Sequence, residues 1–159
     1  MVEFLYMTID DLKNIVKDIV GKANNLKRKI TVEEAPINYA CIFCQNEKEY
    51  NLFFEITKQM GVVVQETETG SVFQISPLST VAGTLKLLKI RKPDSTRSER
   101  GDADFTLSNY KQFKEKNLSK SGFKLVQREK FEMIEYLEPG GNARIYFSNP
   151  TLAEILNIK

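Results

Sequence analysis

Charged side chains gather near the middle of the chain, and their types are those that could bind a ligand. Arginine offers paired N–H donors to planar oxyanions, so this stretch can clamp a phosphate or a carboxylate. Two carboxylates, Asp102 and Asp104, follow it directly. The alternative is a solvated strand edge and loop whose charges offset one another. The cationic residues of the stretch are Lys86, Lys89, Arg91, Lys92, Arg97 and Arg100.

Histidine is absent from all 159 residues. Its absence removes the usual Ser–His and Cys–His catalytic pairs and the commonest metal ligand. The sequence also lacks the glycine-rich loops that bind nucleotide phosphates and the G-x-S-x-G sequence of many hydrolases. Motifs therefore supply no catalytic residue, and the sequence leaves open whether the protein is an enzyme.

Cys41 and Cys44 form a C-x-x-C sequence. Redox proteins use this spacing with one thiolate at the start of a helix. Here Cys41 falls inside the apolar run 37–43, which reads as a strand, and residues three apart on a strand face opposite sides. No second C-x-x-C is present to complete a structural zinc site. We therefore predict two buried cysteines, with a redox or metal function as the alternative.

The elements that must hold these side chains repeat within the chain. An offset of about 60 residues pairs Tyr50 with Tyr110, Phe53 with Phe113 and Glu55 with Glu115. Apolar alternation and turn residues make each copy read as a strand, a helix and three further strands. The first copy predicts a strand at 37–43, a helix at 47–60 and strands at 62–64, 71–75 and 85–91. The second predicts a strand at 102–107, a helix at 108–121 and strands at 123–126, 132–137 and 143–147.

Cap residues support the two helices of the repeat. Ser108 suits the N-cap of the second helix, because its hydroxyl can accept from a free backbone N–H. Gly61 and Gly122 stand where the two helices should end, and glycine tolerates the left-handed conformation common at that position.

A further helix precedes the repeat. Thr8 is a suitable N-cap, and apolar residues recur after it at helical spacing. Gly21 and the polar Asn24–Asn25 predict the end of this helix. We expect its apolar face to pack on the domain, with a dimer contact as the alternative. The chain is thus predicted to be a single domain, 1–159, with an N-terminal helix in 1–28, a first module in 37–92 and a second in 101–150.

The second copy ends in a segment that is similar to a known family. Residues 136–145, Tyr-Leu-Glu-Pro-Gly-Gly-Asn-Ala-Arg-Ile, resemble the aromatic strand, the "DPDGN" turn and the last strand of the vicinal oxygen chelate superfamily. That superfamily includes glyoxalases, extradiol dioxygenases and bleomycin-resistance proteins. The resemblance covers roughly residues 37–150. It implies an α+β fold in which two βαβββ modules pair into an open, cup-like mixed sheet, here with an extra N-terminal helix.

The resemblance also implies where a ligand would bind. In that family the metal ligands come from the first and fourth strands of each module. The matching positions here lie near Tyr39, at Asp102 or Asp104, and within 85–89 and 144–146. Only the aspartates are good ligands, and basic neighbours would repel an ion. The chain is therefore similar to members that bind a small molecule without a metal or other cofactor. The candidate ligand-binding residues are Tyr39, Lys89, Arg91, Arg100, Asp102, Asp104, Tyr136 and Tyr146.

Two other functions fit parts of the sequence. The basic strand 86–92 and nearby glutamates could bind a triphosphate and Mg²⁺, as in the adenylyl cyclase and thiamine triphosphatase tunnel fold. The sequence lacks the E-x-E-x-K that this fold needs near its N-terminus. The second alternative is a protein-interaction module that uses the N-terminal helix. The glutamates concerned are Glu66, Glu68, Glu132 and Glu135.

The composition of the chain indicates which classes of partner the protein is expected to bind. A net charge of +2 is too small to indicate nucleic acid, and the basic strand lacks the interleaved aromatic residues that stack on bases. No apolar run approaches the roughly 20 residues needed to cross a bilayer. Without a basic signal-peptide start, and with only two cysteines, we expect a cytoplasmic protein. We also expect a homodimer, since open cups of this kind often complete their sites with a partner.

Overall fold

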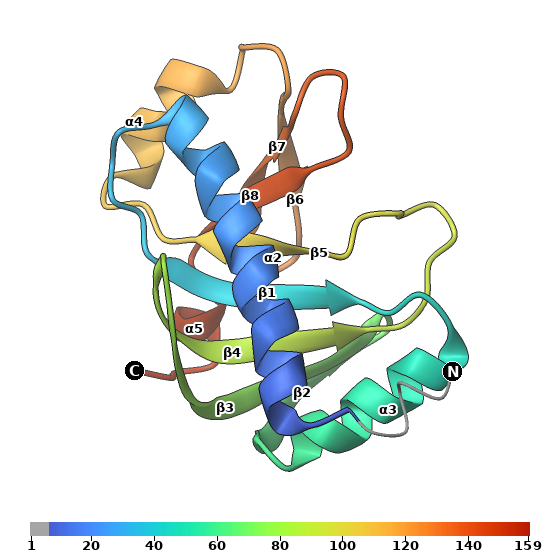
Figure 1. Ribbon diagram of the computed structural model, residues 1–159. Helices are drawn as coiled ribbons and strands as arrows, with labels where there is room; N and C mark the ends of the chain where they lie inside the picture. Colours follow the sequence, from blue (N-terminus) through green and yellow to red (C-terminus); the bar gives the residue numbers. More distant parts are fainter. Residues whose placement is uncertain (1–6) are drawn as a thin grey trace.

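Two βαβββ modules follow one long helix in this computed structural model, which describes residues 7–159 (Figure 1). The long helix is α2, Ile9–Ile30. The first module comprises β1 (Ile37–Phe43), α3 (Glu47–Lys58), β2 (Gly61–Thr67), β3 (Gly70–Thr80) and β4 (Gly83–Arg91). The second comprises β5 (Gly101–Phe105), α4 (Tyr110–Asn117), β6 (Phe123–Gln127), β7 (Glu132–Leu137) and β8 (Arg144–Asn149). A short helix, α5 (Leu152–Ile155), follows β8.

The strands of both modules form one open mixed sheet in the order β2-β3-β4-β1-β5-β8-β7-β6. The second half of this order mirrors the first. In each module the first and fourth strands pair in parallel, and the antiparallel pair of β1 and β5 joins the modules. The predicted α+β fold of two βαβββ modules with an extra N-terminal helix is therefore confirmed. No helix within residues 7–159 is long and apolar enough to span a membrane.

The N-terminal helix begins at the predicted cap. Thr8 Oγ1 accepts from the Asp11 N–H at 3.1 Å, and the Asp11 carboxylate accepts from the Thr8 N–H at 2.8 Å, which completes a capping box. The predicted end near Gly21 is wrong, because the helix continues to Ile30. Ala23 and Leu26 remain buried beyond the glycine. Their packing outweighs the helix-propensity cost of one glycine, about 1 kcal/mol.

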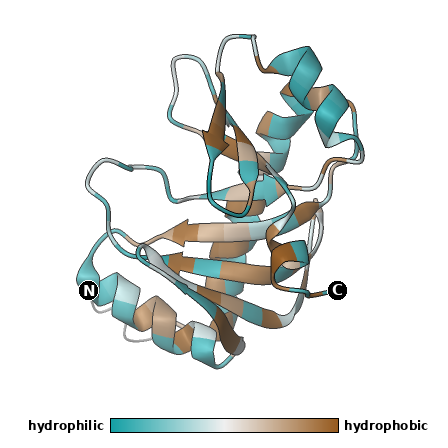
Figure 2. Ribbon diagram, turned by 180° about the vertical axis from the view of Figure 1, so that it is seen from behind, coloured by the Kyte–Doolittle hydropathy of each residue, from teal (hydrophilic) through white to brown (hydrophobic). Residues whose placement is uncertain are grey.

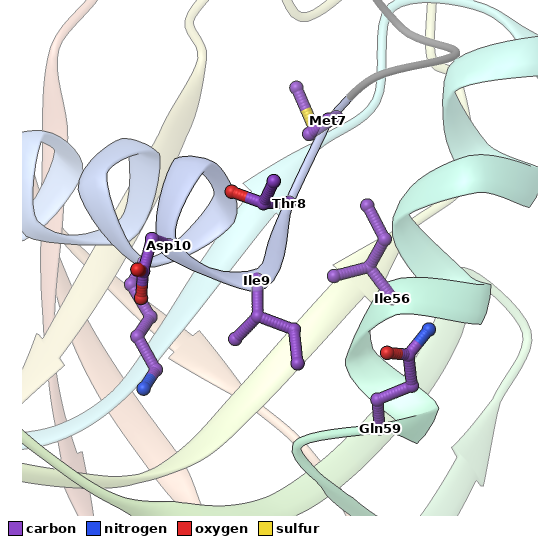
Figure 3. Close-up of a pocket in the computed structure, with 7 residues that line it drawn as sticks. Met7, Thr8, Ile9, Asp10, Ile56 and Gln59 are labelled. Carbon is purple, nitrogen blue, oxygen red and sulfur yellow. The ribbon is translucent and has the colours of Figure 1, made fainter.

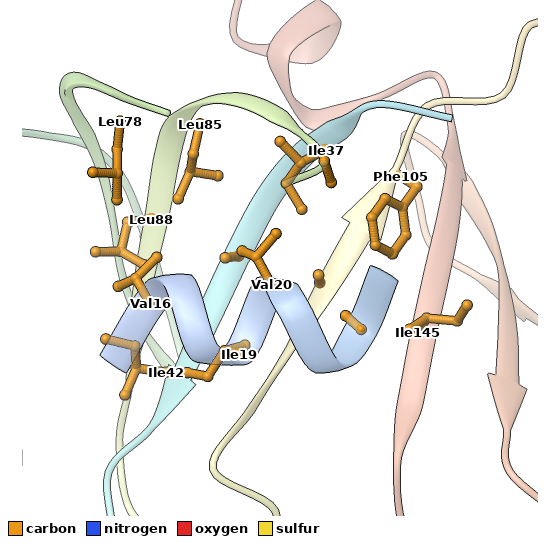
Figure 4. Packing of buried hydrophobic residues seen from close by; sticks show 14 of the residues in the cluster. Val16, Ile19, Val20, Ile37, Ile42, Leu78, Leu85, Leu88, Phe105 and Ile145 are labelled. Atoms are coloured by element: carbon orange, nitrogen blue, oxygen red, sulfur yellow. The ribbon is translucent and has the colours of Figure 1, made fainter. Parts of the chain in front are cut away.

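The apolar core lies between the sheet and α2, α3 and α4. Figure 4 shows Val16 and Val20 of α2 among Ile42 and Leu88 of the first module and Phe105 of the second. All five side chains are fully buried. Burying a side chain of this size contributes roughly 1.5–3 kcal/mol, so α2 stabilises both modules at once. Its apolar stripe is covered by its own domain, as predicted.

Local contacts correct three of the predicted caps, and one of them is Gly122, because α4 already ends at Asn117 with Leu118 as its C-cap. Asn109, not Ser108, caps α4, since its Oδ1 accepts from the Gln112 N–H at 3.0 Å. The Ser108 N–H and hydroxyl instead donate to the Glu33 carboxylate. Gly61 does not cap α3 but opens β2, where a Cβ would lie 1.9 Å from the carbonyl oxygen of Gln74. Glycine is needed there for close approach between strands rather than for a left-handed turn.

The side of the sheet opposite α2 and α3 is called here the inner face, and Figure 2 views the molecule from that side. Residues that alternate with the core residues Ala40, Ile42, Ala103 and Phe105 point toward it. The α5 segment packs on β1, where the Ala153 N–H donates to Asn38 Oδ1 at 3.3 Å. Helices α2, α3 and α4 therefore cover one side of the sheet, and the inner face carries polar side chains among buried apolar ones such as Val72 and Leu87.

Candidate functional site

Strand pairing gathers most of the predicted ligand-binding residues into two rows on the inner face. In one row Tyr39 of β1 pairs with Asp104 of β5, which pairs with Tyr146 of β8. Glu135 of β7 continues that row beside Tyr146. In the neighbouring row Cys41 lies between Lys89 of β4 and Asp102 of β5. Arg91 lies two residues beyond Lys89 on the same strand face.

Two carboxyl groups lie deep in these rows. Asp102 is 8% exposed and Asp104 is 1% exposed. Burial raises the pKa of Asp102 to about 7, against the lowering effect of Arg97 and Arg91. Burial likewise raises the pKa of Asp104 to about 7, although its carboxylate accepts from the Ser148 N–H and hydroxyl. Both groups can therefore change protonation near neutral pH.

A chain of ion pairs crosses the inner face from Asp102 toward β7. Arg97, in the connector between the modules, pairs with Asp102 at 3.4 Å and with Glu99 at 3.0 Å. Arg144 at the start of β8 lies 3.5 Å from Glu99 and 3.5 Å from Glu135. Glu135 in turn accepts from the Tyr146 hydroxyl at 3.0 Å. The connector thus folds back on the sheet, where its ion pairs join strands of the second module and the Arg97 guanidinium lies 4.6 Å from the centre of the Phe43 ring of the first.

The β4 side of the inner face is cationic. The Lys89 ammonium donates to Thr69 Oγ1 at 2.6 Å, and burial lowers the pKa of Lys89. The Arg91 guanidinium lies 4.7 Å from the centre of the Phe43 ring and pairs with Asp94 at 3.1 Å. Its Nε is buried and has no hydrogen-bond partner among the described residues. This side therefore presents donors rather than acceptors.

Two tyrosines supply neutral hydroxyls. Burial raises the pKa of Tyr39 well above its ordinary value, and Asp104 and Asp102 raise it further. Burial also raises the pKa of Tyr146, with Asp102 and Glu135 as added causes. Both phenols therefore remain protonated at neutral pH and can donate or accept hydrogen bonds.

Arg100 and Tyr136 lie outside this cluster. The Arg100 guanidinium reaches the α3 side of the sheet, where it pairs with the buried Glu49 at 2.5 Å and donates to the carbonyl oxygen of Phe43. Tyr136 packs against the ring of Phe123, with the ring centres 4.7 Å apart, beside the apolar core. These two residues therefore hold the fold on the side away from the inner face.

Arg97, Glu99, Glu135 and Arg144 also belong to the cluster. In the sequence, Arg97 belongs to the basic stretch and Glu135 to the glutamates of the triphosphate alternative, but none of the four was predicted to form part of the small-molecule site. Glu135 and Arg144 could have been found by extending strand alternation to β7 and β8. Arg97 and Glu99 lie in the connector, which has no periodicity from which a side-chain direction could be read.

The cysteines are buried and free, as predicted. Cys41 lies on the inner face, whereas Cys44 belongs to the apolar core on the other side. Burial raises the pKa of the Cys41 thiol and raises that of Cys44 to about 12. Neither thiol is therefore activated as a nucleophile.

Ligand sets for metal or triphosphate do not assemble around the basic strand. Within residues 7–159 no group of three Cys, Asp or Glu side chains is arranged to hold a metal ion. Glu66 accepts from Ser71 on the outer hairpin, and Glu132 pairs with Lys114 at 2.7 Å on the second module.

Two hollows lie away from the inner face. One, of about 560 Å³, lies between the start of α2 and the end of α3, and is lined by Thr8, Ile9 and Gln59 (Figure 3). The other, of about 790 Å³, lies beside the end of α2 and the β3–β4 turn. The inner face itself is occupied by its own charged side chains. A ligand there would contact a polar surface rather than an apolar cavity.

A solved structure has the same fold. The structural-genomics protein Protein EC4020 has a TM-score of 0.70 to this chain, covering 93% of this chain and 91% of its own, at 12% sequence identity. At that identity the likeness shows the fold alone. The sequence matches no known family model and no curated protein.

Proposed function

We propose that the protein binds a small molecule on its inner face without a metal, as members of the glyoxalase and bleomycin-resistance type do. The observation that carries this proposal is that most of the residues predicted to bind a ligand lie together on the inner face. Six of the eight residues predicted from the sequence meet on one face, although they come from four strands of two modules. They are Tyr39, Lys89, Arg91, Asp102, Asp104 and Tyr146.

The energetics of the cluster also support a binding role. A buried ion-pair network is commonly no more stabilising than apolar side chains of the same volume. A face built only for stability would therefore not need four cations and several carboxylates. Strongly shifted pKa values, as at Asp102 and Asp104, also tend to gather at functional sites.

The test is a thermal-shift screen followed by paired substitutions. A panel of small organic acids, sugars and aromatic compounds is titrated, because a ligand that binds only the folded protein raises its Tm. Tyr39→Phe combined with Tyr146→Phe should remove most of the shift caused by any hit. Tyr136→Phe is the matched control, since that hydroxyl lies off the inner face. Equal loss in the control, or no hit in the panel, would count against the proposal.

A homodimer in the cytoplasm is the setting that we propose for this binding. The sheet is open rather than closed into a barrel, so a second copy could pack beside the inner face. Sedimentation of the purified protein at several concentrations measures this directly, and a monomer at every concentration would remove the dimer from the proposal. The protein-interaction alternative is less well supported, because the apolar stripe of α2 is already buried.

A further inference from the structure

The β4 side of the inner face carries more positive charge than its carboxylates offset. Lys89 and Arg91 are neighbours on one strand face, and Asp94 is the carboxylate paired with Arg91. Asp94 also accepts from the Thr96 N–H at 2.9 Å and from its hydroxyl at 2.6 Å. The Lys89 ammonium contacts the Thr69 hydroxyl and has no carboxylate partner among the described residues. Lys89 is thus left without a carboxylate in direct contact within the described part of the chain, since Asp102 of the same row lies one strand further away.

Arg91 also has a donor without an acceptor. Its Nε–H is buried and makes no hydrogen bond within the described chain. Buried donors are rarely left this way, because the lost hydration is not replaced. The Phe43 ring and Asp94 hold the guanidinium in place. The orphan donor therefore has a fixed direction, as a preformed binding group should.

Arg144 provides an informative contrast at the other end of the cluster. Its Nε is likewise buried and without a hydrogen bond. However, the carboxylates of Glu99 and Glu135 each lie 3.5 Å from its guanidinium. These two negative charges would repel an anion. The positive and unsatisfied end of the inner face is therefore the one formed by Lys89 and Arg91.

We infer that the ligand carries an oxyanion group, a carboxylate or a phosphate, that accepts from Arg91 Nε and lies beside the Lys89 ammonium. This inference rests on the proposed function and adds the chemical class of the ligand. A neutral acceptor would satisfy the Nε–H but leave Lys89 without an anion in direct contact. An oxyanion satisfies both, and charge-assisted hydrogen bonds are the stronger kind. The Thr69 hydroxyl, already in contact with Lys89, is a third polar group at the same place.

The first test uses the unmodified protein. ¹⁵N-labelled protein is titrated with sodium phosphate and, separately, with sodium acetate, at constant ionic strength because salt screens weak electrostatic binding. We expect saturable shifts of the backbone amides of Thr69, Lys89 and Arg91 with at least one probe. The stronger probe identifies the group as phosphate-like or carboxylate-like. Shifts confined to another cationic region, such as Lys27 and Arg28 at the end of α2, would overturn the inference.

Substitutions then test the assigned donors. Arg91→Lys keeps the charge but removes the Nε donor, and Lys89→Gln removes the ammonium charge. Each should weaken binding of the better probe by about tenfold, the usual effect of losing one charge-assisted hydrogen bond. Lys92→Gln is the matched control, since it removes one positive charge at an exposed position on the same segment. An equal effect of Lys92→Gln, or none from Arg91→Lys in folded protein, would overturn the inference.

Failure of the inference is distinguishable from failure of the proposed function. If a neutral compound from the thermal-shift screen perturbs Tyr39 and Tyr146 while phosphate and acetate do nothing, the binding function stands and the anion subsite does not exist. If neither the anions nor any compound of the screen binds, both the inferred anion subsite and the proposed binding function are wrong.

Discussion

In the first module, the inner face of β4 ends in two cations, Lys89 and Arg91, whereas β8 of the second module carries Arg144 and Tyr146 beside two glutamates. The strands are equivalent by register. Leu88 pairs with Ala40 of β1 in the way that Ile145 pairs with Ala103 of β5, which places Lys89 and Tyr146 at corresponding positions. The strand pairing is therefore the same in the two modules, whereas the side chains at corresponding positions of the inner face differ.

This difference teaches that the two faces of the sheet follow the repeat to different extents. The core side chains remain alike in the two modules, since Phe53 and Phe113 occupy equivalent buried positions on α3 and α4. Both must fill space under a helix, and the same residue serves twice. The inner face differs between the modules, since β4 of the first places Lys89 and Arg91 there whereas β5 and β7 of the second place Asp102, Asp104 and Glu135.

The largest expected effect comes from breaking the ion pairs of the connector. Arg97→Ala leaves Asp102 buried without its ion-pair partner and leaves Glu99 with Arg144 alone, and removing one member of a buried ion pair costs about 3–5 kcal/mol. Urea unfolding followed by circular dichroism measures the free energy of unfolding. Lys58→Ala breaks the exposed pair with Glu55 and should cost under about 1 kcal/mol. Similar costs for the two variants would show that the connector network contributes little.

Six of the eight residues predicted to bind a ligand lie on one face of the sheet, and all six lie inside regular strands. Alternation along β1, β4, β5 and β8 is enough to place the six gathered residues on one face. Arg100 precedes β5 by one residue, so alternation no longer fixes its direction, and Glu49 attracts it to the α3 side. Tyr136 lies one residue after the inward Glu135, and the same alternation applied to β7 would have placed it in the core.

The connector could not have been placed from the sequence. Residues 92–100 contain no periodic pattern, and their folding onto the inner face depends on charges that are distant along the chain. The Arg97 guanidinium lies 4.6 Å from the centre of the Phe43 ring, and Glu99 pairs with Arg144. In both contacts the partners are far apart in the sequence. The extent of α2 was underestimated for a similar reason, since its last turns are held by tertiary packing rather than by propensity.

A smaller effect is expected from the two buried carboxyl groups, Asp102 and Asp104, which should make the free energy of unfolding depend on pH. Asp102 and Asp104 have pKa values raised from 3.8 to about 7, so between about pH 4 and pH 7 the folded state binds more protons than the unfolded state. The free energy of unfolding should therefore fall as pH rises through this window and level off above it. Asp102→Asn should remove about half of that fall, as measured by urea midpoints from pH 4 to 8.

Asp94→Asn is the control for this pH profile because its shift has the opposite sign. Hydrogen bonds from Thr96 lower the pKa of Asp94, so its contribution to stability is present above pH 4 and lost as pH falls. Asp94→Asn should leave the decline between pH 4 and pH 7 intact. A profile that is flat in the wild type would contradict the raised pKa values of the buried pair.

The smallest expected effect is the change in Tm on adding divalent ions. This measurement tests whether Asp102 and Asp104 can bind a metal ion. Asp102 and Asp104 stand at positions that the sequence resemblance matches to metal ligands. However, Asp102 already forms an ion pair with Arg97, and Asp104 already accepts a hydrogen bond from the Ser148 hydroxyl. An ion would have to displace both partners and find a third ligand close to four cationic side chains. Titrating chelator-treated protein with Mg²⁺, Mn²⁺, Zn²⁺ and Ni²⁺ should therefore leave the Tm unchanged. A saturable rise with one ion, abolished by Asp104→Asn, would mean that the carboxylates exchange their present partners for metal and that the second module retains a ligand set of its own.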